Sequence, residues 1–255
     1  MSAQPSPPGD DAPGIMVSVP AEPVPARAVL PALYELVEAH TRNALATVAA
    51  EGRTISCKAG CGACCRYFVP VSGVEAYALA DLVERMPEPR RTTIKKRFAD
   101  AEARLAEWRP FDEQIRGEPL PDDEHKRMVT EYFHLGIPCP FLEAESCSIH
   151  PDRPLVCREY FVTSPAEHCA SHDARHQVKG VRRKFVAHAL WYLTSEEPTP
   201  KATVMPLTLA LHWVKHRAGE EQRRKGLEWL RRFSLILENL ARNHRLNATP
   251  PGDRA

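Results

Sequence analysis

The sequence contains no run of about 18 apolar residues, so it predicts no membrane-spanning helix. Its beginning also lacks the basic stretch and the apolar stretch of a secretory leader. Acidic and basic residues nearly balance, at 33 and 34, which leaves no overall field that would draw the chain onto nucleic acid or an acidic membrane. We therefore expect a cytoplasmic protein without a membrane partner.

Motifs of the common nucleotide-binding and hydrolytic enzymes are also missing. The chain has no P-loop, no dinucleotide-binding glycine fingerprint and no G-x-S-x-G elbow. Basic runs occur at Lys179 to Lys184 and at Arg223 to Lys225, but they lack the interleaved aromatic residues of RNA-binding strands. Such runs are typical of a solvated helix face, so we do not expect nucleic acid as a partner.

What the sequence does contain is eight cysteines and 24 prolines. In a reducing compartment, cysteines favour metal ligation or redox chemistry over disulfide bonds. A chain of 255 residues with 43% hydrophobic content can bury a core without covalent cross-links. A metal site therefore explains the cysteines better than a disulfide framework does.

Composition divides the chain into four parts. Residues 1–26 are rich in Pro, Ser, Asp and Ala without an apolar period, and they predict a disordered tail. We expect a cysteine-cluster metal-binding domain over residues 27–195. A C-terminal helical extension packed on it should follow over residues 196–246, and a second disordered tail over residues 247–255.

Apolar residues at helical spacing predict helices over residues 28–50 and 90–108. Ser72 and Glu75 form a capping box that should start another helix, ending near Met86. Pro70 confines the apolar residues before this helix to an extended or edge segment.

The remaining pattern predicts helices over residues 178–193, 204–217 and 220–244 and irregular structure over residues 109–124. Residues 139–169 should be loop-rich because they carry several prolines. The predicted fold is mainly α, with little β structure. Its helices flank two cysteine-rich loop blocks that converge on a metal site.

The first cysteine block holds four thiols within nine positions: Cys57, Cys61, Cys64 and Cys65. Thiolates this close repel one another, and a cation stabilises several of them at once. Gly60 and Gly62 suit a loop that wraps around a metal, because glycine allows backbone turns that a Cβ atom forbids. Adjacent thiols can bind one ion only where the loop bends sharply.

The second block holds Cys139, Cys147 and Cys157 in a segment stiffened by prolines. It can present three thiols towards the first block. The seven cysteines of the two blocks are the predicted metal ligands. Cys169, beyond the second block, is expected to be a buried small hydrophobe and dispensable for metal binding.

Three sequence motifs are similar to those of one known family. They are the run CGACCR that begins at Cys61, Cys139-Pro-Phe-Leu with Cys147-Ser-Ile-His downstream, and Arg153-Pro154-Leu-Val-Cys157-Arg158. Over about residues 55–160 the chain is similar to the YkgJ-type cysteine-cluster proteins, a family described as zinc- or iron-chelating with the motif C-x-x-C-x-x-C-C. This chain differs in having three residues between Cys57 and Cys61. The resemblance implies a bound metal or iron–sulfur cluster.

The number of thiols bears on which metal is bound. A single tetrahedral zinc needs four ligands at about 2.3 Å, whereas an iron–sulfur cluster distributes its ligands over several irons. Seven thiols therefore favour an iron–sulfur cluster or iron, with zinc as the alternative.

The role of such a site stays open at this stage. It can be structural or redox, and a redox thiol protein without a permanent cluster is a further alternative. A related class with a similar cysteine run methylates lysines of flagellin. By analogy, a cluster-dependent enzyme that modifies a protein or peptide substrate is therefore the alternative function.

Charged neighbours of the cysteines are further candidates. Arg66 and Arg158 each follow a cysteine and can donate hydrogen bonds to thiolates, or they can be solvated or paired with acids such as Glu159. His150 lies within the second block and is a candidate ligand or proton relay. A histidine row would form one stripe on a helix and could hold a second metal: His168, His172 and His176.

Overall fold

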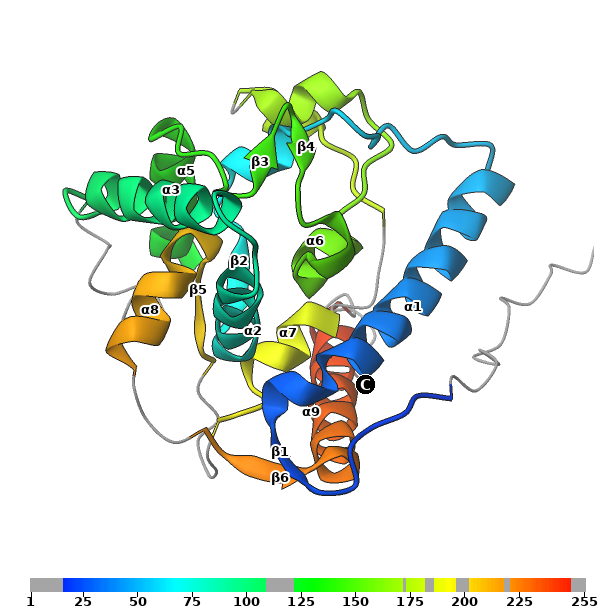
Figure 1. Ribbon diagram of the computed structural model, residues 1–255. Coiled ribbons are helices and arrows are strands. Elements are labelled where there is room, and N and C mark those ends of the chain that lie inside the picture. The colour runs from blue at the N-terminus through cyan, green and yellow to red at the C-terminus, as the bar shows by residue number, and fades with distance from the viewer. Residues whose placement is uncertain are drawn as a thin grey trace, which may run out of the picture.

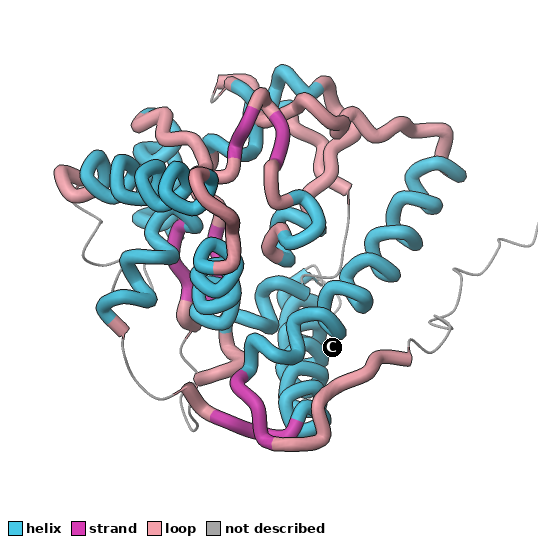
Figure 2. Tube along the Cα trace, in the orientation of Figure 1, coloured by secondary structure: helices cyan, strands magenta, loops and turns pink. Residues whose placement is uncertain are grey.

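The computed structural model describes residues 16–108, 122–171, 173–181, 186–195, 202–217 and 221–248. Helices dominate these residues, and the short strands form two-stranded antiparallel ribbons, so the prediction of a mainly α fold is confirmed (Figures 1 and 2). Within the described ranges no helix is both long and apolar enough to cross a membrane.

The first helix follows the prediction closely. A 3₁₀ turn, η1 (Ala26–Val29), leads into α1 (Leu30–Ala50), and Gly52 ends the helix with a φ of 69°. Before them, β1 (Pro23–Pro25) pairs with β6 (Arg223–Lys225), so ordered structure begins inside the segment expected to be a tail.

The capping box is present as predicted. Ser72 accepts a hydrogen bond from the amide of Glu75, and the Glu75 carboxylate accepts one from the amide of Ser72, which starts α2 (Gly73–Glu84). The extended segment before it is β2 (Pro70–Ser72), and α3 (Arg90–Leu105) buries the expected apolar face.

The sequence did not predict α5 (Asp122–His134), whose first residues fall in the stretch expected to be irregular. The earlier part of that stretch, residues 109–121, lies outside the described residues. Met128 and Tyr132 of α5 are buried in a small core with Phe68 and Trp108. Met128 and Tyr132 recur at helical spacing, a signal that the prediction from sequence did not use, and their tertiary packing stabilises the helix.

The segment over residues 139–169 is loop-rich, as predicted. It contains a hairpin, short 3₁₀ turns and one short helix: β3 (Leu142–Glu143), β4 (Ser146–Cys147), η3 (His150–Asp152), α6 (Leu155–Glu159) and η4 (Ala166–Ala170). A further turn, η5 (Arg175–Gln177), follows.

Three predicted C-terminal helices are shorter than expected. In the first of them, Gly180 forms a β-bridge with Val162, residues 182–185 lie outside the described residues, and only α7 (Val186–Trp191) is helical. The second begins as β5 (Val204–Pro206) and η6 (Leu207–Leu209) before α8 (Ala210–His216). The third begins as β6 before α9 (Gly226–Ala248), and β5 and β6 exist because each finds a distant partner strand.

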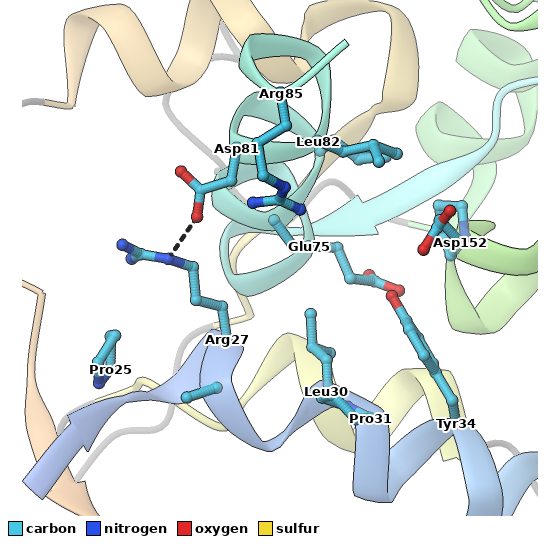
Figure 3. A pocket seen from close by; sticks show the side chains of 14 residues that line it. Pro25, Arg27, Leu30, Pro31, Tyr34, Glu75, Asp81, Leu82, Arg85 and Asp152 are labelled. Carbon is cyan, nitrogen blue, oxygen red and sulfur yellow. Dashed lines mark ion pairs between the residues drawn. The ribbon is translucent and has the colours of Figure 1, made fainter. Parts of the chain in front are cut away.

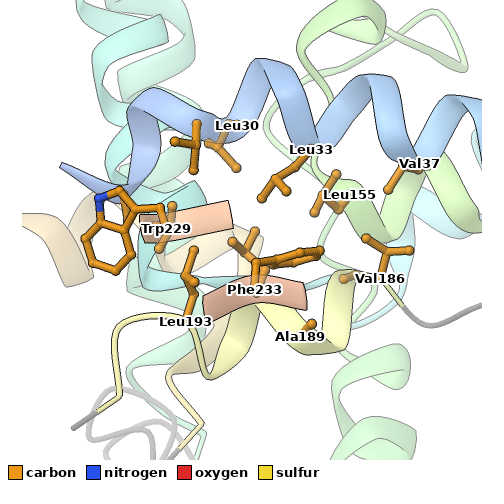
Figure 4. Close-up of a cluster of buried hydrophobic side chains, with 14 residues drawn as sticks. Leu30, Leu33, Val37, Leu155, Val186, Ala189, Leu193, Trp229 and Phe233 are labelled. Atoms are coloured by element: carbon orange, nitrogen blue, oxygen red, sulfur yellow. The ribbon is translucent and has the colours of Figure 1, made fainter. Parts of the chain in front are cut away.

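Two hydrophobic cores hold the second cysteine block in place. Figure 4 shows Leu155 of α6 among side chains of α1, α7 and α9, including Leu33, Val186 and Phe233. The other core packs α2, α3 and α8 against Phe141 and Ile149, which flank the β3–β4 hairpin. The loops that carry the cysteines are therefore anchored on both sides by buried apolar side chains.

Candidate metal centre

The two cysteine blocks contact each other directly through the backbone. The amide of Cys139 donates a hydrogen bond of 2.7 Å to the carbonyl of Cys65, and the amide of Gly60 donates one of 3.1 Å to Ser146 Oγ. The Arg66 guanidinium also binds both carboxylate oxygens of Glu145, at 2.9 and 2.5 Å. Segments about 75 residues apart in the chain thus form one loop layer above the cores (Figure 1).

Two glycines make this contact possible for different reasons. Gly60 has a φ of 80°, a left-handed conformation that disfavours other residues. Gly62 has an ordinary backbone, but a Cβ atom there would lie 2.6 Å from Leu142 Cδ1 and 2.7 Å from Glu145 Oε2. The sequence predicted a turn at both glycines, whereas at Gly62 the requirement is close packing against the second block.

Cys64 and Cys65 lie in the 3₁₀ turn η2 (Ala63–Arg66), so the backbone bends sharply where adjacent thiols need it to. Their thiols are hydrogen-bonded, and this bond, more than burial, raises the pKa of Cys64. In a 3₁₀ turn, neighbouring side chains no longer point to opposite sides as they do in a strand.

Cys64 interacts electrostatically with more of the other thiols than any other cysteine does. Its negative charge, when present, adds to the effect of burial in raising the pKa of five other thiols: Cys57, Cys139, Cys147, Cys157 and Cys169. Such effects fall off with distance, so Cys64 is close to thiols of both blocks.

Burial dominates at the thiols of the second block. Desolvation raises the pKa of Cys139 to about 12, and the charges of Cys147 and Cys64 add to this rise. The pKa of Cys157 is raised well above its usual value, again mainly by burial. A cation among these thiols would favour the thiolate form and so release protons on binding.

Buried charged residues fix the short helix that carries Cys157. Glu75 of α2 accepts a hydrogen bond of 2.8 Å from the amide of Leu155 at the start of α6. Arg158 donates bonds of 2.8 Å to Glu38 and to the carbonyl of Arg153, and its guanidinium lies 3.9 Å from the centre of the Tyr34 ring. Cys157 is therefore held by contacts to both α1 and α2.

Glu159, at the end of α6, caps the next helix. Its carboxylate oxygens accept bonds from the amides of Val186 and Ala187, at 2.9 and 3.1 Å. A carboxylate at a helix N-terminus is favoured by the helix dipole. The ion pair of Arg158 is formed with Glu38, rather than with Glu159 as the sequence suggested.

Arg153 is a residue that sequence reasoning missed. Its positive charge opposes the rise in pKa that burial causes at Cys57 and Cys147 and that the hydrogen bond with Cys65 mainly causes at Cys64, so the guanidinium lies near thiols of both blocks. Its Nε atom is buried without a hydrogen-bond partner in the described structure. Arg153 precedes a proline rather than following a cysteine, so the rule that selected Arg66 and Arg158 did not select it.

Cys169 has the burial that the sequence predicted, but its neighbours among the thiols were not predicted. It is buried, its thiol is hydrogen-bonded to Tyr160, and the charges of Cys57, Cys64 and Cys61 contribute to raising its pKa after the larger effect of burial. The structure thus brings Cys169 to the first block. In the sequence, only its position twelve residues after Cys157 indicates that Cys169 could lie with the other candidate ligands, and this signal is weak.

The predicted histidine stripe is wrong. His168 lies in η4 and His176 in η5, two separate 3₁₀ turns, and His172 lies outside the described residues. A 3₁₀ turn cannot place residues four apart on one face. His150 is exposed at the start of η3, where the charge of Arg153 lowers its pKa.

The donor atoms suit a thiophilic metal, since zinc and iron–sulfur clusters are both held by thiolates. All eight cysteines are described, and all are free thiols. In the described part of the chain, however, no group of three or more His, Cys, Asp or Glu side chains is positioned to hold a metal ion. The structure therefore shows the two blocks in contact and supplies the donors, but it does not show a closed coordination shell.

Comparison with known proteins identifies the class of this segment. Residues 56–177 match the family model CxxCxxCC, whose description is "putative zinc- or iron-chelating domain". This match confirms the resemblance read from the cysteine motifs, and it includes Cys169. Searches of curated proteins and of solved structures found no match. The description of this family supports a metal, zinc or iron, as the ligand of the matched segment.

Proposed function

We propose that the two cysteine blocks together bind one metal centre, an iron–sulfur cluster in preference to zinc, with a structural or electron-carrying role. The observation that carries this proposal is the direct contact of the two blocks, in which the amide of Cys139 donates a hydrogen bond of 2.7 Å to the carbonyl of Cys65, beside Cys64. The ligands are the seven cysteines named from the sequence: Cys57, Cys61, Cys64, Cys65, Cys139, Cys147 and Cys157.

Cys169 joins this set as an eighth thiol. The sequence alone led us to expect that it is dispensable, and its buried position beside the first block is the reason for including it. Eight thiols exceed the four of a single tetrahedral zinc even further than seven do. The number of donors thus favours an iron–sulfur cluster or two metals.

Anaerobic purification followed by absorption spectroscopy and metal analysis tests the proposal. We expect brown protein with iron and acid-labile sulfide in stoichiometric amounts. Colourless protein with bound zinc would retain the shared site but reject the iron–sulfur cluster. Protein that holds neither metal after anaerobic handling and reconstitution would reject the proposed function.

An enzyme that modifies a protein or peptide is the second candidate, and the exposure of Cys64 favours it. A catalytic centre needs a side that a substrate can reach, whereas a closed structural site does not. The rate at which a bulky maleimide alkylates Cys64 in the metal-free, reduced protein measures that access, because a metal-bound thiolate would be protected whatever its exposure. Complete protection of Cys64 would reject the enzymatic candidate.

A further inference from the structure

A cavity of about 330 Å³ lies between α2 and the start of α1, and no cysteine lines it. Its walls come from three parts of the chain: η1 with the start of α1, the face of α2 that is turned towards α1, and the turn before α6 (Figure 3). This volume is in the range of sites for small molecules. The apolar part of its lining is supplied mainly by Leu30, Pro31, Ala78, Leu79 and Leu82.

Most charged groups around the cavity already have partners. Arg27 forms an ion pair of 2.9 Å with Asp81 and a second ion pair with Glu221. Glu75 is buried, and its oxygens accept hydrogen bonds from Ser72 and from the amide of Leu155. These residues shape the wall and have little capacity left for a ligand.

Two charged side chains differ from the rest. Arg85, which directly follows α2, and Asp152 of η3 line the cavity from its exposed rim, and neither forms an ion pair or a side-chain hydrogen bond within the described part of the chain. In Figure 3 the Arg85 guanidinium points into the cavity beside Leu82, and the Asp152 carboxylate lies across the cavity from the Arg27–Asp81 pair. The cavity thus offers a cation and an anion, with apolar surface between them.

Tyr34 adds a neutral polar group at the Asp152 end. Its hydroxyl lies next to the Glu75 carboxylate in Figure 3, and the described residues form no hydrogen bond with it. Burial, followed by the charge of Glu75, raises the pKa of Tyr34, so the hydroxyl stays protonated. It can therefore donate or accept a hydrogen bond at this end of the cavity.

We propose that this cavity binds a small zwitterion of about dipeptide size. The ammonium group of the ligand lies at Asp152 and the Tyr34 hydroxyl, its carboxylate lies at Arg85, and its apolar body contacts Leu30 and Leu82. Opposite charges at the two ends fix one orientation, since the reversed ligand would place like charges together. No cysteine lines this site, although Tyr34 and Glu75, which line it, also contact residues close to Cys157 in the chain.

Calorimetric titration of the full chain with leucyl-leucine, its N-acetyl derivative and its C-terminal amide tests the proposal. For the unmodified protein we expect saturable binding of the free dipeptide, weakened about tenfold by either blocking group. In Arg85→Gln the amide should bind as well as the free dipeptide, while acetylation still weakens binding. In Asp152→Asn the N-acetyl derivative should bind as well as the free dipeptide, while the C-terminal amide should still bind more weakly.

The matched controls are Lys96→Gln and Asp100→Asn, which alter an exposed ion pair on α3 and should leave every titration unchanged. Thermal unfolding of each variant verifies that it is folded. Absence of saturable binding at millimolar dipeptide would overturn the proposal. The proposal would also be overturned if, in both Arg85→Gln and Asp152→Asn, acetylation and amidation of the dipeptide weakened binding to the same extent.

Discussion

The amide of Cys139 donates a hydrogen bond of 2.7 Å to the carbonyl of Cys65, and this bond joins the two cysteine blocks at one point of the backbone. The position of one block relative to the other is therefore set by the main chain. Substitution of a cysteine side chain leaves this bond in place, so cysteine variants can report on metal binding without first separating the blocks.

Substitution of single cysteines by serine should rank their contributions to metal binding. Cys64→Ser should lose the most metal per chain, because Cys64 is close to thiols of both blocks. Cys57→Ser should lose less, because its spacing departs from the family motif. Metal analysis after anaerobic reconstitution measures the ranking, and full retention by Cys64→Ser would contradict the shared site.

Cys169→Ser decides between a site of seven thiols and one of eight. We expect a loss of metal comparable to that of Cys57→Ser, because both cysteines lie near Cys64. Tyr160→Phe is the matched control, since it removes the hydrogen bond to Cys169 but keeps the thiol. Retention of metal by Cys169→Ser would limit the site to the seven cysteines of the two blocks.

Gly62→Ala should separate the blocks. The added methyl group would lie 2.6 Å from Leu142 Cδ1 and 2.7 Å from Glu145 Oε2, so the Arg66–Glu145 pair must shift. We expect a loss of about 1 kcal/mol in unfolding free energy, at the lower end for overpacked sites because both atoms end flexible side chains, together with weaker metal binding. Gly180→Ala is the control, since a Cβ atom there would meet no described atom within 4 Å; an unchanged Gly62→Ala protein would refute the packing argument.

Arg153→Gln should make the thiols harder to ionise. Removing this charge takes away the attraction that favours the thiolate form of Cys57, Cys64 and Cys147, so the pKa of each should rise. The rate of thiol alkylation in the metal-free protein should therefore rise at a higher pH than in the unmodified chain. Lys96→Gln, which removes a distant exposed charge, should leave the pH profile in place.

The metal-free protein should lose stability in alkali. Burial raises the pKa of Cys139 from 9.0 to about 12, so at pH values between these two the unfolded thiol is ionised while the folded thiol stays protonated. The unfolded state then binds fewer protons than the folded state, and the free energy of unfolding falls as pH rises above about 9. Denaturant titrations of reduced protein across this range measure the slope, and a stability that rises with pH would contradict the assignment.

Local signals in the sequence predicted those elements that depend on local interactions. The Ser72–Glu75 capping box placed the start of α2 because the hydrogen bonds that define it span only three residues. Residues 204–206 and 223–225 were predicted as parts of helices because their strand partners are β2 and β1, far away in the chain. Propensity carries no information about such pairing.

The candidate site shows the same division. Cysteine spacing identified the thiols of both blocks, whereas the places of Arg153 and Cys169 depend on how the loops fold over the cores. The roles expected for Arg66 and Arg158 also depended on tertiary partners, which are Glu145 and Glu38. Spacing along the chain therefore identifies donors better than it identifies their charged neighbours.

The pairing of β1 with β6 has a consequence for how the chain is made. Pro23 pairs with Lys225, so this ribbon cannot form until about 200 further residues have left the ribosome. The partner strand of β2, which lies directly after the first cysteine block, also comes late in synthesis. Each new chain thus passes through a period in which its thiols are synthesised while β1 and β2 still lack their partner strands.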